Sequence, residues 1–242
     1  MADSPYHYVP EARNNPDHPA HHVPVRPAAS VVLLRDQGVG VEVFVQFRAK
    51  TMDFAAGVAV FPGGRSEPGD HQAGDGLLSP EAIAEHAQIW SRTRLVLDDA
   101  TPGVAAMAAT AVREVWEETA VRLSGEQLVP WANITTPLGA PKRFDTYFYV
   151  AAVTDEQQHQ VRNVTTEATE ARWLSTTDLL QAFAAEQIAL MRPTLYLVKT
   201  VHALKTIPEI VAGHQPVVTP LSGLRGVTLD SDDSHFTAET NH

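Results

Sequence analysis

The sequence predicts an α/β protein of the α+β type, because it combines a β-hairpin signal, a long isolated strand and several capped helices. Two runs rich in β-branched residues, 28–35 and 41–47, flank the turn signal DQGVG, which is typical of an antiparallel hairpin. A third strand-like run, FDTYFYVAAV, occupies 144–153. Helical periodicity and capping residues mark the segments 79–97, 101–119, 176–186 and 192–206.

Composition restricts the classes of protein that the chain can represent. Its 242 residues, 44% of them hydrophobic, suit one domain with short appendages. No run approaches the ~18 apolar residues of a membrane span, and the first residues lack the basic start and apolar core of a secretory signal. We therefore expect a cytoplasmic protein without a membrane partner. The net charge of -11 argues against a nucleic-acid partner, but a small phosphorylated ligand remains compatible with it.

The chain divides into three parts. Residues 1–27 are rich in proline, asparagine and histidine, and we expect a flexible arm. The domain occupies 28–212, and a polar tail occupies 213–242. Within the domain, GVAVFPGG (57–64) predicts a short strand that is broken by Pro62 and two glycines. Successive glycines indicate either a sharp turn or the close approach of a ligand, and the following residues, 65–80, are polar and turn-rich.

The predicted helices have recognisable starts. Ser79 is the expected N-cap of 79–97, with Pro80 at the first helical position, and Thr101-Pro102 opens 101–119 in the same way. A short strand is expected at 170–175, followed by 176–186 with Thr176 or Thr177 as its cap. The last helix, 192–206, presents apolar residues at the helical period: Leu195, Val198, and Val201 or His202.

The segment AVREVWEETAV (111–121) contains the acidic residues that indicate a chemical function. On a helix, Glu114, Glu117 and Glu118 stand at i, i+3 and i+4 and share one face. Like charges at this spacing destabilise a helix unless cations or water offset the repulsion. Hard carboxylate oxygens suit Mg²⁺ or Mn²⁺, so the spacing indicates a divalent metal site. A solvated charged face is the alternative.

FPGGRSEPGD followed by REVWEETAV resembles the signature of the Nudix (MutT-like) hydrolases, G-x5-E-x7-R-E-U-x-E-E-x-G-U. Gly64 matches the first glycine, and 113–118 match the second half. Asp70 stands where the signature has its first glutamate, and Ala120 replaces its last glycine, so a left-handed helix cap there would be strained or absent. Between Asp70 and Arg113 lie 42 residues instead of seven. We take 71–108 as an insertion that loops out beside the site and serves as a lid, a specificity wall or a dimer contact.

The resemblance implies a Nudix fold, a mixed β-sheet sandwiched between helices, and a hydrolase that uses Mg²⁺ or Mn²⁺ to cleave a diphosphate bond. It implies that Glu117 and Glu118 bind metal, with Glu114 as a metal ligand or general base and the carbonyl of Gly63 as a further ligand. Arg113 would orient the glutamates, with Asp70 as its support. The general base in this family is not always inside the signature, so Glu167 and Glu170, before Trp173, are reserve candidates.

The resemblance indicates which bond is cleaved, a diphosphate bond, more clearly than which substrate contains it. The segment from Arg48 to Gly64 resembles that of coenzyme A diphosphatases of the family, and TPLGAPKRFDTYFYVA (136–151) resembles their peroxisomal-type branch. Arg48, Arg143 and Gly64 are the expected substrate contacts, although Asp53 replaces a basic residue of that pattern. Hydrolysis of CoA or acyl-CoA is therefore the first choice. ADP-ribose or another dinucleotide-type diphosphate is the alternative.

Other classes fit less well. The isoprenoid isomerases that share the fold need a catalytic cysteine, which this chain lacks. A non-catalytic ligand-binding domain is disfavoured because the arginine and all three glutamates of the signature are present. A structural protein with a charged helix would bind Mg²⁺ negligibly. Members of the family are often homodimers, so a homodimer is a further expectation.

Overall fold

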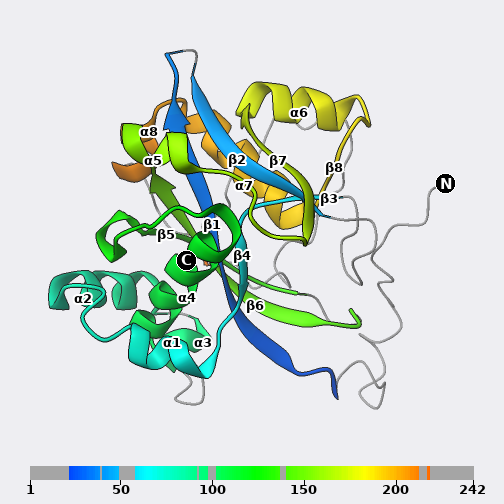
Figure 1. Ribbon diagram of the computed structural model, residues 1–242. Helices are drawn as coiled ribbons and strands as arrows, with labels where there is room; N and C mark the ends of the chain where they lie inside the picture. Colours follow the sequence, from blue (N-terminus) through cyan, green and yellow to red (C-terminus); the bar gives the residue numbers. More distant parts are fainter. Residues whose placement is uncertain are drawn as a thin grey trace, which may run out of the picture.

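A computed structural model describes residues 22–38, 40–48, 58–91, 93–97, 102–136, 140–212 and 217–218. In chain order the helices and strands are β1 (Val25–Asp36), β2 (Val41–Arg48), β3 (Val58–Val60), β4 (Gly63–Arg65), α1 (Pro68–Ala73), α2 (Pro80–Ile89), α3 (Arg94–Leu97), α4 (Val104–Thr119), the 3-10 helix η3 (Gly125–Gln127), β5 (Val129–Thr135), β6 (Arg143–Ala152), α5 (Asp155–Gln160), β7 (Ala168–Ser175), α6 (Thr176–Ala184), β8 (Ala189–Leu190), α7 (Arg192–Leu204), α8 (Ile207–Ala212) and β9 (Val217–Val218) (Figure 1). Most of the predicted arm and tail, and the Asp53 position, lie outside the described residues. None of the described helices is long and apolar enough to span a bilayer.

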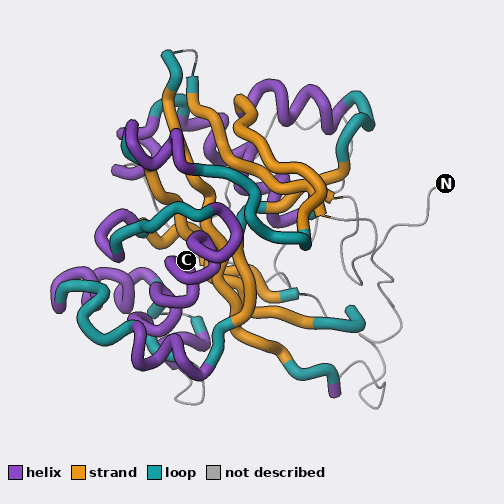
Figure 2. The backbone as a smooth tube through the Cα atoms, in the orientation of Figure 1, coloured by secondary structure: helices purple, strands orange, loops and turns teal. Residues whose placement is uncertain are grey.

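The strands form one mixed sheet, as predicted, in the order β8-β3-β2-β1-β6-β5-β9. The predicted hairpin of β1 and β2 is confirmed, with Leu34 opposite Val43 in antiparallel register, and β1 begins at Val25, before the expected start. On its other edge β1 runs parallel to β6 along ten paired positions, from Val25 opposite Arg143 to Leu34 opposite Ala152. Figure 2 shows helices on both sides of the strands, so the predicted sandwich is also confirmed.

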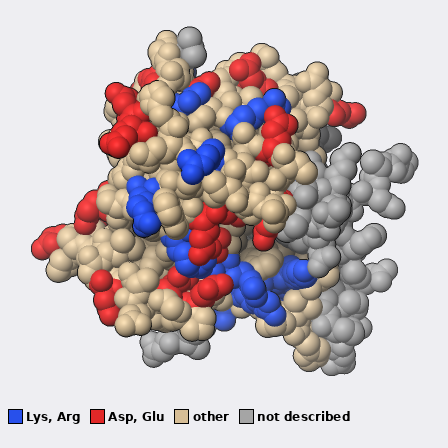
Figure 3. Space-filling view, viewed as in Figure 1, with Lys and Arg blue, Asp and Glu red and all other residues tan. Residues whose placement is uncertain are grey.

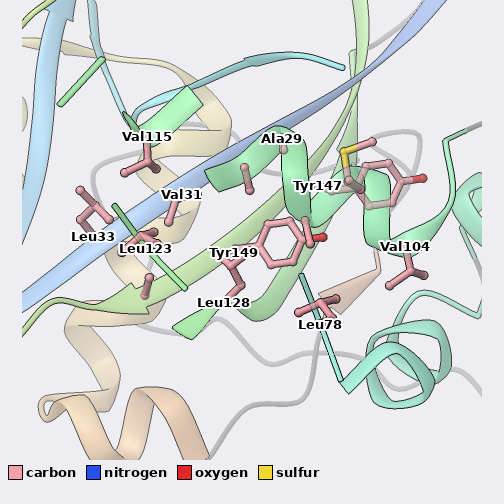
Figure 4. Packing of buried hydrophobic residues seen from close by; sticks show 14 of the residues in the cluster. Ala29, Val31, Leu33, Leu78, Val104, Val115, Leu123, Leu128, Tyr147 and Tyr149 are labelled. Carbon is pink, nitrogen blue, oxygen red and sulfur yellow. The ribbon is translucent and has the colours of Figure 1, made fainter. Parts of the chain in front are cut away.

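Side-chain alternation along β1 divides the core into two layers. Ala29, Val31 and Leu33 point to the layer that contains α4, whereas Val32 and Leu34 point to the opposite one. Figure 4 shows the first layer at close range. Helices α6, α7 and α8 close the second layer, and the apolar residues predicted for the last long helix are buried there: Val198 and Val201 in the second cluster, and Leu195 at 3% exposure.

Several predicted boundaries were wrong. The segment 79–97 forms two helices, α2 and α3, and only the N-cap was placed correctly, since Ser79 Oγ accepts from Ala82 N. Helix α4 begins at Val104 with Gly103 at the N-cap position, later than predicted, and the predicted cap Thr101 lies outside the described residues. Ser175 caps α6, one residue before Thr176 and two before Thr177, the two residues predicted for that role. The polar stretch 65–80 contains α1, which a reciprocal cap between Glu67 and Asp70 starts.

Some elements were missed altogether, for physical reasons. Strand β5 contains Pro130 and Asn133, which are unfavourable in strands, but it pairs antiparallel with β6 on the sheet. The segments β8, α5 and α8 are too short to show a period. Strand β9 falls in the predicted polar tail and pairs parallel with β5 at Ala132 and Asn133.

The described residues of 71–108, the segment predicted to be an insertion, contribute to the core. Leu78, Trp90 and Leu95 belong to the same hydrophobic cluster as α4 and β1. Trp90 is 0% exposed and meets Tyr147 of β6 edge-on, with ring centroids 5.3 Å apart. The expectation of a segment that loops out is therefore wrong: its removal would leave an apolar hole against the central strands.

The FPGG segment crosses a gap in the sheet. Strand β3 pairs with β2 at Gln46 and Phe47, and only two residues later β4 pairs with β1 at Ala29 and Ser30. The two long strands therefore diverge at this point, and the chain steps from one to the other. A Cβ on Gly63 would lie 2.6 Å from Ser30 Cα, so only glycine fits the crossing.

Ala120 ends α4 in the left-handed region, with φ 61° and ψ 16°, and its N–H donates to Trp116 O. The cap is therefore present and strained, because a side chain in this conformation costs about 1–2 kcal/mol.

The substitution Ala120→Gly should stabilise the protein by about 0.5–1 kcal/mol and raise Tm by about 2 °C. Differential scanning calorimetry would measure both.

Ala185 provides a matched control, because it caps α6 with a negative φ of -84°. Ala185→Gly should leave the stability unchanged or lower it by a few tenths of a kcal/mol. Equal effects of the two substitutions would contradict the strain at Ala120.

Candidate active site

Arg113 joins the two halves of the split signature. Its Nε and Nη2 donate to the two carboxylate oxygens of Asp70 at 2.9 and 3.0 Å. Nη2 also donates to the carbonyl of Arg65 at 2.9 Å. One guanidinium on α4 thereby fixes both β4 and α1, although Asp70 is 43 positions away in the sequence. The two residues are together as predicted for Arg113 and its support.

Asp70 is buried and fully engaged, with 2% exposure. Besides Arg113, it accepts from Glu67 N and Thr110 Oγ1, each at 2.8 Å. Burial alone would raise its pKa, but the bonds from Arg113, Glu67 and Thr110 outweigh it and hold the pKa below the usual value. Thr110 was not identified from the sequence. Its only signal was a polar residue one turn before Arg113 in an alanine-rich helix.

Arg113 also holds two of the three glutamates. Its Nη1 donates to Glu114 at 2.8 Å and to Glu117 at 3.1 Å. Burial raises the pKa of Glu114 and the charge of Arg113 opposes that rise. Gly64 faces Glu114 directly, since a Cβ on Gly64 would lie 2.6 Å from the carboxylate carbon. The predicted close approach at the second glycine therefore exists, and its neighbour is a carboxylate.

Glu118 lies at the gap between the diverging strands. Its carboxylate accepts from Gly63 N at 3.1 Å, and its backbone carbonyl accepts from Gln46 Nε2 at 3.5 Å. Burial, with smaller contributions from the charges of Glu114 and Glu167, raises its pKa to about 8. The Gly63 N–H and Arg48 favour the ionised form but do not outweigh burial. The surroundings of Glu118 thus favour its neutral form, and a cation beside it would stabilise the ionised form.

The structure separates the two reserve base candidates. Glu167 comes to the site: its carboxylate lies 3.7 Å from Arg48 Nη2, and its charge acts on Glu118. Glu170 does not. It stands opposite Phe47, whose ring packs against the α6–α8 layer, and its carboxylate pairs with Arg172 at 3.4 Å. Glu170 therefore belongs to the sheet face opposite α4, contrary to its grouping with the site.

The two arginines predicted to contact substrate lie on the α4 side of the sheet at different places. Arg48 ends β2 next to Glu167 and Glu118. Its buried Nε has no hydrogen-bond partner among the described atoms. Arg143 starts β6, where its Nε donates to the carbonyl of Thr136 at 3.1 Å. Burial lowers the pKa of Arg143, and the charge of Arg94 lowers it further.

The donors at this site fit a hard divalent cation. The carboxylates of Glu114, Glu117 and Glu118 and the carbonyl of Gly63 supply oxygen only, which suits Mg²⁺ or Mn²⁺. Among the described residues, no three His, Cys, Asp or Glu side chains already converge as a metal-binding group. Arg113 holds two of these carboxylates and Gly63 N–H holds the third, so cation binding requires their side chains to rotate.

Comparison with known proteins agrees with this geometry. The family model of the NUDIX domain matches residues 87–194. The chain is therefore similar to a Nudix domain over this stretch. Over 154 residues it is 25% identical to putative nudix hydrolase 7 of Caenorhabditis elegans, with 62% of this chain and 52% of that protein covered. It thus spans about half the length of this curated relative.

Solved structures of Nudix proteins share the fold of this chain. The NUDIX hydrolase from Alicyclobacillus acidocaldarius superposes with a TM-score of 0.62 at 23% identity, covering 81% of this chain and 99% of that one. The NUDIX domain of Shewanella oneidensis NrtR, complexed with ADP ribose, gives a TM-score of 0.47 at 15% identity, covering 81% and 98%. The first comparison establishes the fold. The second is too distant to assign a ligand.

Removal of the Asp70 charge should destabilise the protein. Asp70→Asn leaves Arg113 without its main partner, and we expect the free energy of unfolding to fall by about 2–3 kcal/mol. The loss is smaller than for a fully buried pair because the Arg113 side chain is 22% exposed. Urea denaturation at pH 7 would measure it. Asp75→Asn, an exposed position nearby, is the control and should change little.

The same pair has a pH signature. The folded-state pKa of Asp70 lies below its unfolded value, so its contribution is present above about pH 4 and is lost as the pH falls through the folded pKa. The stability difference between the wild type and Asp70→Asn should therefore shrink below about pH 4. A difference that stays constant from pH 7 to pH 3 would argue against an ionic role.

Proposed function

We propose that this chain hydrolyses a diphosphate bond in a nucleoside diphosphate linked to another group, with Mg²⁺ or Mn²⁺ as cofactor. The observation that carries the proposal is the arrangement around α4. Its carboxylates lie against the Gly63–Gly64 crossing, with the Arg113–Asp70 pair behind them. The relatedness to proteins described as Nudix hydrolases supports the same reaction class.

Glu114, Glu117, Glu118 and the Gly63 carbonyl would hold the cations. When bound, they neutralise the charge of the diphosphate and make a water molecule more acidic. Arg113 holds Glu114 and Glu117 next to the crossing through charge-assisted hydrogen bonds, and the two side chains would rotate from this arrangement to bind a cation. The absence of a side chain at Gly64 leaves the Glu114 carboxylate in contact with the strand.

The hydrolysis needs a base for the attacking water. Water adds to one phosphorus, the bridging oxygen leaves with the other phosphate, and the proton of the water passes to a carboxylate. Glu167 suits this role because it lies next to Arg48, its charge acts on Glu118, and its side chain is 56% exposed. Glu114 is the alternative base, but the Arg113 bond and its smaller exposure of 13% favour a ligand role.

CoA or acyl-CoA is the substrate we propose first, with ADP-ribose or a dinucleotide as the alternative. Arg48 supports a substrate with anionic oxygens at this position, because its buried Nε lacks a partner among the described atoms and such a donor costs about 1–3 kcal/mol. A phosphate oxygen would satisfy it. The homodimer, the cytoplasmic location and the absence of a nucleic-acid partner remain predictions.

Product analysis tests the proposal. Purified protein is incubated with CoA and, separately, with ADP-ribose, each with Mg²⁺ or Mn²⁺, and the products are identified by mass spectrometry. We expect phosphopantetheine and adenosine 3′,5′-bisphosphate from CoA, no reaction with EDTA, and a loss in kcat of at least about 100-fold in Glu118→Gln. Cleavage of ADP-ribose but not of CoA would reject CoA as the substrate and support ADP-ribose. No product with either metal, or turnover that survives EDTA and Glu118→Gln, would contradict the metal-dependent hydrolysis.

Substitution of the two reserve candidates identifies the base. Glu167→Gln should lower kcat by about 10²–10⁴-fold, because the water then has no carboxylate to receive its proton. Glu170→Gln is a matched control with the same 56% side-chain exposure, and it should retain activity. The pH–rate profile of Glu167→Gln should lose its acidic limb. Equal losses in both variants, or a loss in Glu170→Gln alone, would exclude Glu167 as the base.

A further inference from the structure

The inserted segment is joined to the central strand by a hydrogen bond from its backbone. Leu95 N, in α3, donates to Tyr147 Oη of β6 at 3.0 Å. Tyr147 Oη in turn donates to Asp145 Oδ2 at 3.0 Å, and Asp145 also accepts from Asn133 Nδ2. All three of these side chains are buried. The start of α3 is therefore held at a fixed place over β6.

This anchoring brings a second arginine to the site's side of the sheet. Arg94 directly precedes Leu95 and is exposed. Along β6, Arg143 and Tyr147 share one face because they are four positions apart, and Tyr147 points to the α4 layer. The charge of Arg94 contributes to the lowered pKa of Arg143, which is consistent with two guanidinium groups near enough to repel each other.

The pair lies within reach of a ligand bound at the carboxylates. Gly64, Ala29 and Tyr147 stand in one row across β4, β1 and β6. With strand spacings of about 4.8 Å and a rise of about 3.3 Å per residue, the Arg143 backbone is roughly 16 Å from Gly64. Long arginine side chains shorten that gap. Figure 3 shows Lys and Arg side chains gathered beside acidic ones over the region of α4, β4 and β6, on a protein whose net charge is -11.

We propose that Arg94 of the insertion and Arg143 of β6 together bind a phosphate group that the ligand carries in addition to its diphosphate. This inference rests on the proposed function and narrows the substrate class to nucleotides that carry a further phosphate group. CoA is an example, because it has a phosphate at the 3′ position. Two guanidinium groups close together offer a doubly charged anion several charge-assisted hydrogen bonds. The insertion thus acts as a specificity wall, and its contribution to the site is Arg94.

The test compares two nucleotides that differ by one phosphate. Binding of adenosine 3′,5′-bisphosphate and of adenosine 5′-monophosphate to the full chain, with Mg²⁺ present, is measured by isothermal titration calorimetry. We expect the bisphosphate to bind at least about tenfold more tightly. Arg94→Gln should abolish the preference and Arg94→Lys should restore part of it. The preference should also weaken at high salt.

Arg172→Gln is the control, since this arginine lies on the opposite sheet face beside Phe47. It should leave the preference unchanged. Equal affinities for the two nucleotides, binding of neither, or equal effects of Arg94→Gln and Arg172→Gln would overturn the proposal.

Measurements of turnover distinguish a failure of the phosphate site from a failure of the proposed hydrolase activity. Hydrolysis of CoA and 3′-dephospho-CoA with the same KM would keep the diphosphatase and overturn the phosphate site. A tenfold bisphosphate preference that depends on Arg94, in a protein that cleaves no diphosphate, would keep the phosphate site and overturn the hydrolase. An increase in KM for CoA in Arg94→Gln, with kcat unchanged, supports both.

Discussion

The pairing of Arg113 with the buried carboxylate of Asp70 is the constraint on which the site depends. Asp70 can stay ionised at 2% exposure only because the guanidinium and two further donors surround it. The same guanidinium reaches the Arg65 carbonyl and two glutamates. A single side chain therefore sets the distance between α4 and the strand crossing, and with it the place where the carboxylates gather.

The gap between β1 and β2 explains why the glycines are needed at that place. The chain passes from one strand to the other within two residues, and the Gly63 N–H is left to face Glu118 instead of another strand. A side chain at Gly64 would occupy the position of the Glu114 carboxylate. Sheet geometry and the negative charge of α4 are thus two parts of one site, because the backbone can approach the carboxylates only where the strands diverge.

The long stretch between Asp70 and Arg113 contributes to the same core as α4. Trp90 and Leu95 fill the layer between α4 and the central strands, and Tyr147 ties α3 to β6. The hydrophobic contacts offset the closure entropy of a long connection, which grows only slowly with length. Asp70 has a shorter side chain than the glutamate of the signature. It lies in the first turn of α1, and the backbone there brings its carboxylate within reach of Arg113.

Sequence alone determined the parts that depend on local spacing. The β1–β2 hairpin, the β6 strand, α4 and the shared face of its glutamates follow from residue periods of two and 3.6. The resemblance to the Nudix signature placed Asp70 with Arg113 despite their separation. Only the tertiary structure decided which side of the sheet each remaining residue occupies. Glu167 and Glu170 are both candidates in the sequence, but Glu167 lies in the bend just before β7 and next to Arg48, whereas Glu170 lies within β7 on the face opposite α4. Arg94 is held on the α4 side of the sheet because its neighbour Leu95 bonds to the buried Tyr147 of β6, and no local sequence pattern records such a contact.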